Sequence, residues 1–300
     1  MRILVAPLLA AAALWGQGGG VGGVRMGVVF DRPTKAVRIV EGVAGSAHLG
    51  GAVLEGVETA WVASSGKAAV VRGAGGWAVV KGLAGETVEE QGLEMEVEGA
   101  RWSAGGRYVA VAGRERIEVW DVEGLERVTG VDAGEGRESV SVAVSDAGEL
   151  AVAWFDGEQT AVEAWRQGQW EELGRVPGKG VAAVLGDVVA VAGAGEVVVV
   201  RAGQEVWRVA LERGDAPVGI EIVGREVVAA YGGERAVLMV WDLEKGEGTA
   251  VELEAAPERL ERVGGGEGLV LRLREREGEE TWVAVRRGGG WQAYFVPAGE

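Results

Sequence analysis

The sequence has 300 residues, no cysteine and a formal net charge of −16 at pH 7. The absence of cysteine excludes disulfides, thiolate nucleophiles, iron–sulfur clusters and cysteine-bound zinc. The acidic balance argues against binding to nucleic acids or to anionic lipid surfaces, because both depend on Lys and Arg. Charged partners should therefore be cationic. The alternative is that the acidic side chains only keep an apolar, β-rich chain soluble.

The first 17 residues are typical of a signal peptide. One positive charge, Arg2, precedes an uncharged apolar run from Ile3 to Leu14. This run is too short to span a bilayer, but its length suits the core of an export signal. The alternative is a buried first strand, which fits poorly with Pro7 and with the four alanines at residues 10–13.

Cleavage is expected after Ala13 or close to Gln17, and the Gly-rich residues 18–24 are expected to form a flexible spacer. No cysteine follows the apolar core, so no lipid attachment is expected. We therefore predict a signal peptide at 1–17, a spacer at 18–24 and a folded domain at 26–300. The mature protein is expected to be periplasmic or secreted, without membrane insertion.

A motif of an apolar strand, a tight Gly turn and a second apolar strand returns about every 40 residues. Its clearest copy runs from Trp102 to Val111. A period of roughly 40–45 residues with four strands per unit is that of a β-propeller. The sequence thus predicts an all-β chain that forms a single propeller of four-stranded blades. The turn glycines are Gly66, Gly106, Gly148, Gly186, Gly224 and Gly266, at steps of 40, 42, 38, 38 and 42 residues.

The unit around Gly106 predicts four strands, from the innermost outwards, at 100–103, 107–112, 116–122 and 126–131. In other units the second strands are uninterrupted apolar runs rich in Val, which suits strands covered on both faces by neighbouring blades. These runs are 150–154, 188–192, 227–231 and 269–273. No helix is expected after the signal region.

Two of the third strands end in a Trp-Asp pair, Trp120-Asp121 and Trp241-Asp242. These pairs resemble the ending of WD40 repeats, and Ser103 to Val111 resembles a segment shared by WD40-like and YVTN-type bacterial propellers. The resemblance covers nearly all the chain from Met26 to Pro297 and implies the fold without implying a function. A chain whose only histidine is His48 departs from eukaryotic-type WD40 repeats, because it cannot supply their Gly-His pair in each blade. The chain is therefore more similar to secreted bacterial propellers.

The number of blades depends on the hairpin at residues 26–41, which precedes six complete units at 57–297. Its residues Val28 to Lys35 parallel Val240 to Lys245, so it is expected to supply the outer two strands of a further unit. Two arrangements fit, because a closed ring leaves no exposed sheet edges. Either Ala47 to Leu54 add a strand and make a thin seventh blade, or the hairpin packs against a six-bladed ring. We favour seven blades, with six as the alternative.

No residue is predicted to be catalytic, to bind a cofactor or to ligate a metal. His48 lies in a Gly-rich segment without a nucleophile or metal ligand beside it, so it is expected to be a solvated or locally hydrogen-bonded loop residue. The acidic loop 132–136 lacks the alternating pattern of a calcium site. The glycines at 264–268 precede a strand rather than the helix that a phosphate loop needs, and 272–280 is expected to be a charged hairpin tip.

The twelve tryptophans are the feature with most functional interest. Large aromatics at strand positions are expected to fill the space between blades. Those near the start of a later strand are candidates for partial exposure, where they would contact a sugar or a protein partner. The first group is Trp61, Trp102, Trp120, Trp154, Trp165, Trp241 and Trp282, and the second is Trp77, Trp170, Trp207 and Trp291.

The leading hypothesis is a non-catalytic binding or scaffolding propeller outside the cytoplasm, without a cofactor. Its partner is expected to be a protein or a cell-envelope component, and the chain itself is expected to be a monomer. The alternative is a propeller enzyme of the lactonase, quinoprotein or glycosidase type with a site at the mouth of the central channel, which fold analogy alone supports. Carboxylates or arginines that converge there from different repeats would favour the enzyme.

Overall fold

The computed structural model describes residues 25–297 except 44, 84, 86, 134–136, 167, 213, 234, 255, 264–267, 274–280 and 288–289. The predicted signal peptide and spacer lie outside the described residues. No described residue lies in a helix. Accordingly, the described part of the chain has no helix long and apolar enough to cross a membrane.

Within the described residues, the strands in chain order form one three-stranded sheet followed by six four-stranded blades. The three-stranded sheet, here called the N-terminal sheet, contains β1 (Arg25–Asp31), β2 (Ala36–Glu41) and β3 (His48–Glu55). Blade 1 contains β4 (Thr59–Val62), β5 (Ala68–Gly73), β6 (Gly76–Lys81) and β7 (Glu89–Gly92). Blade 2 contains β8 (Gly99–Trp102), β9 (Tyr108–Ala112), β10 (Arg116–Asp121) and β11 (Glu126–Asp132). Blade 3 contains β12 (Glu138–Val144), β13 (Leu150–Phe155), β14 (Gln159–Arg166) and β15 (Gln169–Pro177). Blade 4 contains β16 (Val181–Leu185), β17 (Val188–Gly193), β18 (Glu196–Arg201) and β19 (Gln204–Ala210). Blade 5 contains β20 (Pro217–Val223), β21 (Glu226–Tyr231), β22 (Val237–Asp242) and β23 (Gly248–Glu252). Blade 6 contains β24 (Pro257–Val263), β25 (Gly268–Leu273), β26 (Thr281–Arg287) and β27 (Gly290–Val296).

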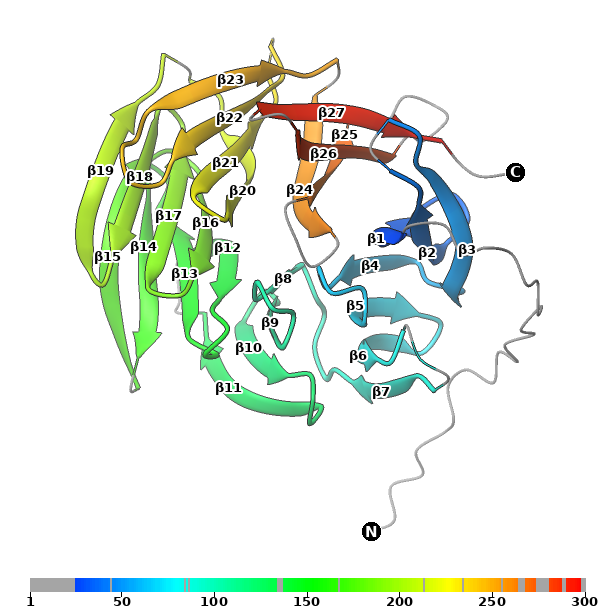
Figure 1. The fold of residues 1–300 in the computed structure, drawn as a ribbon. Helices are drawn as coiled ribbons and strands as arrows, with labels where there is room; N and C mark the ends of the chain where they lie inside the picture. Colours follow the sequence, from blue (N-terminus) through cyan, green and yellow to red (C-terminus); the bar gives the residue numbers. More distant parts are fainter. Residues whose placement is uncertain are drawn as a thin grey trace.

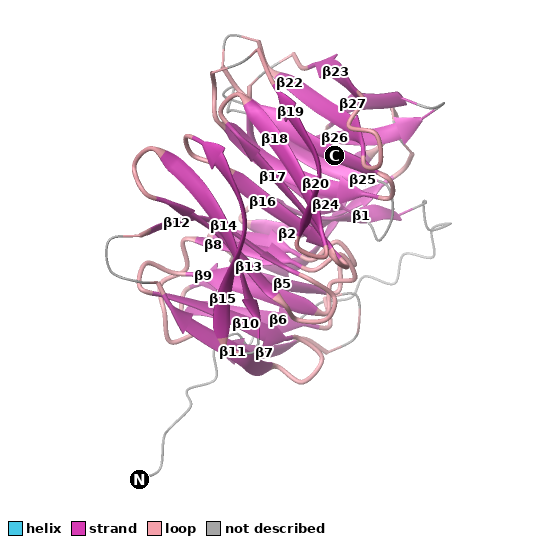
Figure 2. Cartoon of the chain, turned by 90° about the vertical axis from the view of Figure 1, so that its left-hand side faces the viewer, coloured by secondary structure: helices cyan, strands magenta, loops and turns pink. Residues whose placement is uncertain are grey.

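The blades stand around a common centre, with the first strand of each on the inside and the last at the rim (Figure 1). Every strand pairs antiparallel with the next one along the chain within its sheet. This simple up-and-down order explains the 40-residue repeat, since each blade is one continuous stretch of sequence. Figure 2 shows the same sheets from the side. The predicted strands of the Gly106 unit and the predicted apolar second strands are confirmed.

The favoured count of seven blades is wrong, because six sheets of the described residues are four-stranded blades, the number given as the alternative. The segment from Ala47 to Leu54 does add a third strand, β3, to the N-terminal hairpin. However, the hairpin does not occupy the outer positions that we predicted. Strand β1 lies innermost, in contact with β4 of blade 1 and β24 of blade 6.

The N-terminal sheet stands between the sixth and first blades and closes the ring. Its Phe30 and Val37 pack with residues of blade 1, and its Val29 and Leu49 pack with residues of blade 6. The backbone N–H of Leu49 also donates to the carbonyl of Pro297, just after the last strand, at 3.0 Å. The first and last sheets of the domain are therefore joined by both packing and a hydrogen bond.

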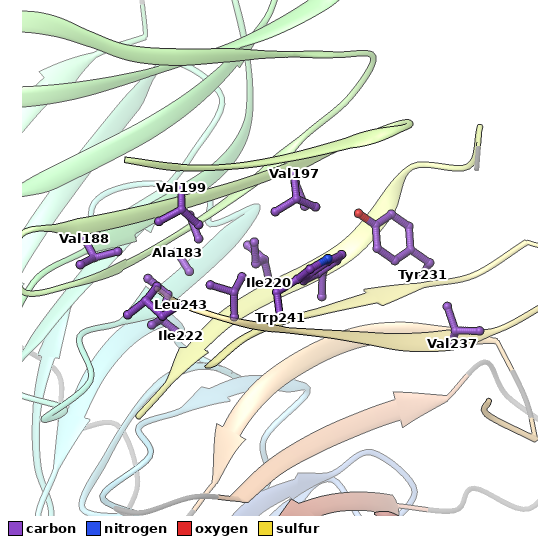
Figure 3. Close-up of a cluster of buried hydrophobic side chains, with 14 residues drawn as sticks. Ala183, Val188, Val197, Val199, Ile220, Ile222, Tyr231, Val237, Trp241 and Leu243 are labelled. Carbon is purple, nitrogen blue, oxygen red and sulfur yellow. The ribbon is translucent and has the colours of Figure 1, made fainter. Parts of the chain in front are cut away.

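The apolar core is divided among the interfaces between neighbouring sheets. The buried side chains that the structure describes form seven clusters, each of which joins two adjacent sheets. Figure 3 shows the cluster between blades 4 and 5, where Trp241 and Tyr231 lie among smaller Val, Ile and Leu side chains. Burial on both faces is the reason that the middle strands are uninterrupted apolar runs.

Candidate functional site: the centre of the ring

Charged side chains from three blades meet at the centre of the ring. Arg101 lies on β8 of blade 2, Glu221 on β20 of blade 5 and Arg262 on β24 of blade 6. The Nη1 atom of Arg101 is 2.7 Å from Oε1 of Glu221 and also donates to the carbonyl of Leu260 at 2.9 Å. One arginine thus bridges the ring from blade 2 to blades 5 and 6.

Glu221 is shared between two guanidinium groups. Its second oxygen, Oε2, is 3.2 Å from Nε of Arg262, which also donates from Nη2 to the carbonyl of Ile222. The side chains of Arg101, Glu221 and Arg262 are 21%, 14% and 17% exposed. Solvent and salt screen such partly buried charges less than they screen surface pairs.

Two tryptophans, Trp61 and Trp102, border this charge cluster. The guanidinium of Arg259 lies 5.0 Å from the ring centroid of Trp61, within the range of a cation–π contact, and its Nη1 donates to Glu261 at 3.0 Å. The indole N–H of Trp102 donates to the carbonyl of Trp61 at 3.0 Å. Trp102 of blade 2 therefore binds the backbone of Trp61, and Arg259 of blade 6 lies over the Trp61 indole.

A small cavity lies between these groups. Its walls include Trp61, Arg101, Trp102, Glu221, Glu261 and Arg262. The volume open to the centre of a water molecule is about 20 Å³, which suits a water or one small polar group and is far below the size of an organic substrate site. Two serine hydroxyls nearby make hydrogen bonds to the backbone, that of Ser64 to the neighbouring blade and that of Ser103 within its own turn. Ser64 donates to the carbonyl of Ala104 at 3.0 Å, and Ser103 accepts from the N–H of Tyr108 at 3.2 Å.

His48 lies away from this centre, and most residues of the three loops considered from the sequence lie outside the described residues. His48 is the first residue of β3 rather than a loop residue, and its half-exposed ring lies 3.8 Å from Glu41. Residues 134–136, 264–267 and 274–280 lie outside the described chain. Among the residues that the structure describes, no three His, Asp or Glu side chains are grouped so that they could hold a metal ion.

The tryptophans follow the predicted division only in part. Trp170 and Trp207 are partly exposed, as expected, but Trp77 and Trp291 are 7% and 6% exposed. Both pack into the apolar clusters between neighbouring blades, and each indole N–H donates to a carboxylate, Glu96 at 3.1 Å and Glu226 at 2.8 Å. Of the seven expected in the core, four are buried, and Trp102, Trp165 and Trp282 are partly exposed.

The aspartates of the two Trp-Asp pairs stabilise turns rather than a buried histidine network. Asp121 accepts from Arg107 at 2.7 Å and from the N–H of Glu123 at 3.0 Å. The hydrogen bond from Arg107 lowers the pKa of Asp121 below its ordinary value. Two backbone N–H groups, of Glu244 and Lys245, lower the pKa of Asp242 in the same direction.

Sequence reasoning missed the charged centre altogether. A signal for it is nevertheless present, because Glu221 stands between Ile220 and Ile222, both fully buried, on an inner strand. Arg101 likewise stands between Ala100 and Trp102. Because side chains alternate along a strand, Glu221 lies on the face opposite Ile220 and Ile222, which is the face towards blade 6, where Arg262 meets it.

The fold defines the class: the chain is a single β-propeller with four-stranded blades. The sequence matches no protein-family model and no curated protein. By shape, the chain is similar to the β-propeller domain of Cps50 (Swd1) from Myceliophteria thermophila, with a TM-score of 0.55 and 12% identity over 82% of this chain and 88% of that one. It also matches hydrazine synthase from Kuenenia stuttgartiensis, with a TM-score of 0.47 and 16% identity over 69% of this chain and 68% of that one. Identities this low establish the fold alone.

Proposed function

We propose that this chain is a non-catalytic β-propeller that binds or scaffolds a protein or a cell-envelope component outside the cytoplasm. The observation that supports this function most is that paired charged side chains occupy the ring centre. Arg101, Glu221 and Arg262 are engaged with one another, and the cavity beside them has room for about one water-sized group. A propeller whose centre is filled in this way offers its loops and rim to partners rather than a channel to a substrate.

Affinity capture tests the binding function. The purified mature protein, immobilised through a C-terminal tag, is exposed to the periplasmic and the secreted fractions of its own cells, and retained proteins are identified by mass spectrometry. The expected result is a recurrent partner that is absent from beads carrying the heat-unfolded protein. Repeated recovery of nothing beyond that background contradicts the proposal.

The extracytoplasmic location rests on the sequence of residues 1–17 and is tested separately. The full chain is expressed in a bacterial host, the cells are fractionated, and the N-terminus of the accumulated protein is sequenced. The expected product lies outside the cytoplasm and begins after Ala13 or close to Gln17. A cytoplasmic product that retains Met1 and Arg2 contradicts this location.

One observation favours the enzyme alternative: arginines and carboxylates from three blades do converge at the ring centre. A screen with lactone and glycoside substrates tests it, with Arg101→Gln as the matched variant. Turnover by the wild type that the variant loses would support an enzyme. Equal background rates for both proteins would contradict it.

A further inference from the structure

Strand β3 is the third strand of its sheet and has no fourth strand beside it. The N-terminal sheet has the order β1-β2-β3, whereas the other six sheets of the described residues have four strands each. β3 therefore forms the rim of its sheet, at a position that a further strand covers in the blades (Figure 1). The burial of the side chains differs accordingly. The middle four residues of the third strands β10 and β18 are all buried, but only Leu49 is buried in β3.

The free edge of β3 offers backbone groups to a further strand. Among the described residues, its one backbone hydrogen bond outside the pairing with β2 runs from the N–H of Leu49 to the carbonyl of Pro297, at 3.0 Å. Beyond Leu49, Gly51 and Ala52 are exposed, and a Cβ atom on Gly51 would have no heavy atom within 4 Å. Register shifts interrupt the pairing of β2 with β3, so the stretch available is short, from Gly51 to Glu55.

β3 also lacks the charges that protect an exposed edge from pairing. Natural sheets discourage the addition of a strand by placing charged residues on the outermost strand. Each of the outer strands β7, β11, β15, β19 and β23 contains at least one Glu. In β3 no charged residue stands between its two ends, His48 and Glu55. β27 of blade 6 is uncharged as well, but it already is the fourth strand of its blade.

An extended segment of another protein fits this edge better than a second copy of the chain. A stable dimer buries about 1,200–2,000 Å², and two rims that meet along one short strand bury far less. An added segment gains affinity from its backbone hydrogen bonds and from side chains at alternate positions. The outer strands β11 and β15 show the pattern, since Val131 and Val176 are buried between exposed neighbours. Apolar side chains of an added strand would cover Val53 and Leu54, which are only partly buried against blade 1.

We propose that β3 is the docking site for an extended, uncharged segment of a partner protein, which adds the fourth strand to the N-terminal sheet. The proposal rests on the binding function proposed above and names the surface used and the conformation of the partner. The added strand pairs with the backbone of residues Gly51 to Glu55. It completes the sheet at the rim and leaves the paired charges of the ring centre in place.

A blocked, fluorescent peptide of about six residues that alternates Thr and Val tests the site. Its binding to the purified mature protein is measured by fluorescence anisotropy, and saturable binding is expected. A peptide of the same sequence with an N-methyl group on every residue cannot donate the hydrogen bonds of a strand. It should bind at least about tenfold more weakly, because it loses two or more hydrogen bonds. No saturable binding of the first peptide, or equal binding of the two, would overturn the proposal.

Two variants of the protein locate the binding. Ala52→Lys places a charge on the free edge of β3 and should weaken binding of the Thr-Val peptide several-fold. Ala250→Lys makes the same change at an exposed alanine of β23, the outermost strand of blade 5, and should leave the affinity unchanged. Equal affinities of the two variants would contradict a site at β3. The comparison of the two peptides needs neither variant, so it remains decisive if Ala52→Lys does not fold.

Sedimentation velocity separates a partner's segment from a second copy of the chain. The wild type should sediment as a monomer at the concentrations of the peptide titration. A dimer that Ala52→Lys dissociates would show that β3 pairs with another copy, and would overturn the proposal. Because these measurements use the purified protein and synthetic peptides, their failure is separate from a failure of affinity capture.

Discussion

At the scale of single residues, glycines with positive φ recur after the first strand of the blades, but their neighbours in space differ. Gly66 and Gly186 lie between the first and second strands of blades 1 and 4, with φ angles of 67° and 59°, although the connection is longer in blade 1, where Val62 pairs with Ala69, than in blade 4, where Leu185 pairs with Val188. A Cβ atom on Gly66 would lie 2.8 Å from Cγ2 of Val28 in the N-terminal sheet, whereas one on Gly186 would have no heavy atom within 4 Å. The turn at Gly66 therefore also fixes the approach of two sheets.

Replacement of these two glycines by alanine separates the two effects. Gly186→Ala should lower the free energy of unfolding by about 1 kcal/mol, because an L-residue at positive φ is strained. Gly66→Ala should cost about 1–2 kcal/mol more, because Val28 must shift. Urea denaturation followed by circular dichroism measures both. Equal losses in the two variants would show that the contact with Val28 carries no constraint.

The Arg107 and Asp121 pair predicts a pH dependence of stability. Because the pKa of Asp121 is lowered in the folded state, the ionised form stabilises the fold above the unfolded pKa of about 4, and this contribution is lost as the pH falls through the folded pKa. Asp121→Asn should cost about 0.5 kcal/mol at pH 7, since Arg107 is 54% exposed and the pair is partly screened by solvent.

Unfolding measured between pH 7 and pH 2 checks this prediction. The difference between the wild type and Asp121→Asn should shrink below pH 4 and disappear at the acidic end. Arg107→Gln removes the other member of the pair, so its difference in stability from the wild type should also shrink below pH 4. A difference that stays constant over the whole range would mean that charge is not the cause.

At the scale of secondary-structure elements, the sequence predicted the strands of the repeats well because their apolar runs and Gly turns are local signals. It misplaced the N-terminal hairpin for a related reason. The similarity between Val28 to Lys35 and Val240 to Lys245 is the similarity of two strand-turn segments. Such a signal shows where a chain reverses, but the position of the hairpin within a sheet depends on which neighbours bury its faces.

Leu49 tests whether the N-terminal sheet is part of the ring or an appendage. Its side chain is 3% exposed and packs against blade 6, so Leu49→Ala should lower the free energy of unfolding by about 2–4 kcal/mol and shift a single transition of the whole domain. Val43→Ala, at a nearby residue that is 54% exposed, should change it by less than about 0.5 kcal/mol.

Tryptophan fluorescence and far-ultraviolet circular dichroism should report the same midpoint for Leu49→Ala, because all sheets unfold together. An early, separate transition that leaves the six blades folded would contradict ring closure by the N-terminal sheet. It would instead indicate the second arrangement considered from the sequence, a hairpin packed against an independent ring.

At the scale of the whole molecule, the central charge cluster depends on closure of the ring. Arg101 and Glu221 are separated by 120 positions in the sequence, and they meet because blades 2 and 5 face each other across the centre. The repeat period predicts the shape of each blade, but the residues that meet across the ring depend on the number of sheets and on their order. For the same reason the local sequence of Trp291 does not predict its hydrogen bond to Glu226 of the preceding blade.

The contact on which the description of the ring centre depends is that between Arg101 of blade 2 and Glu221 of blade 5. A double-mutant cycle with Arg101→Gln, Glu221→Gln and the double variant measures this most directly, through the free energy of unfolding in urea. The expected coupling energy is about 1–3 kcal/mol, because the two side chains are in direct contact and partly buried. A coupling energy near zero would mean that Arg101 and Glu221 do not bind each other in solution.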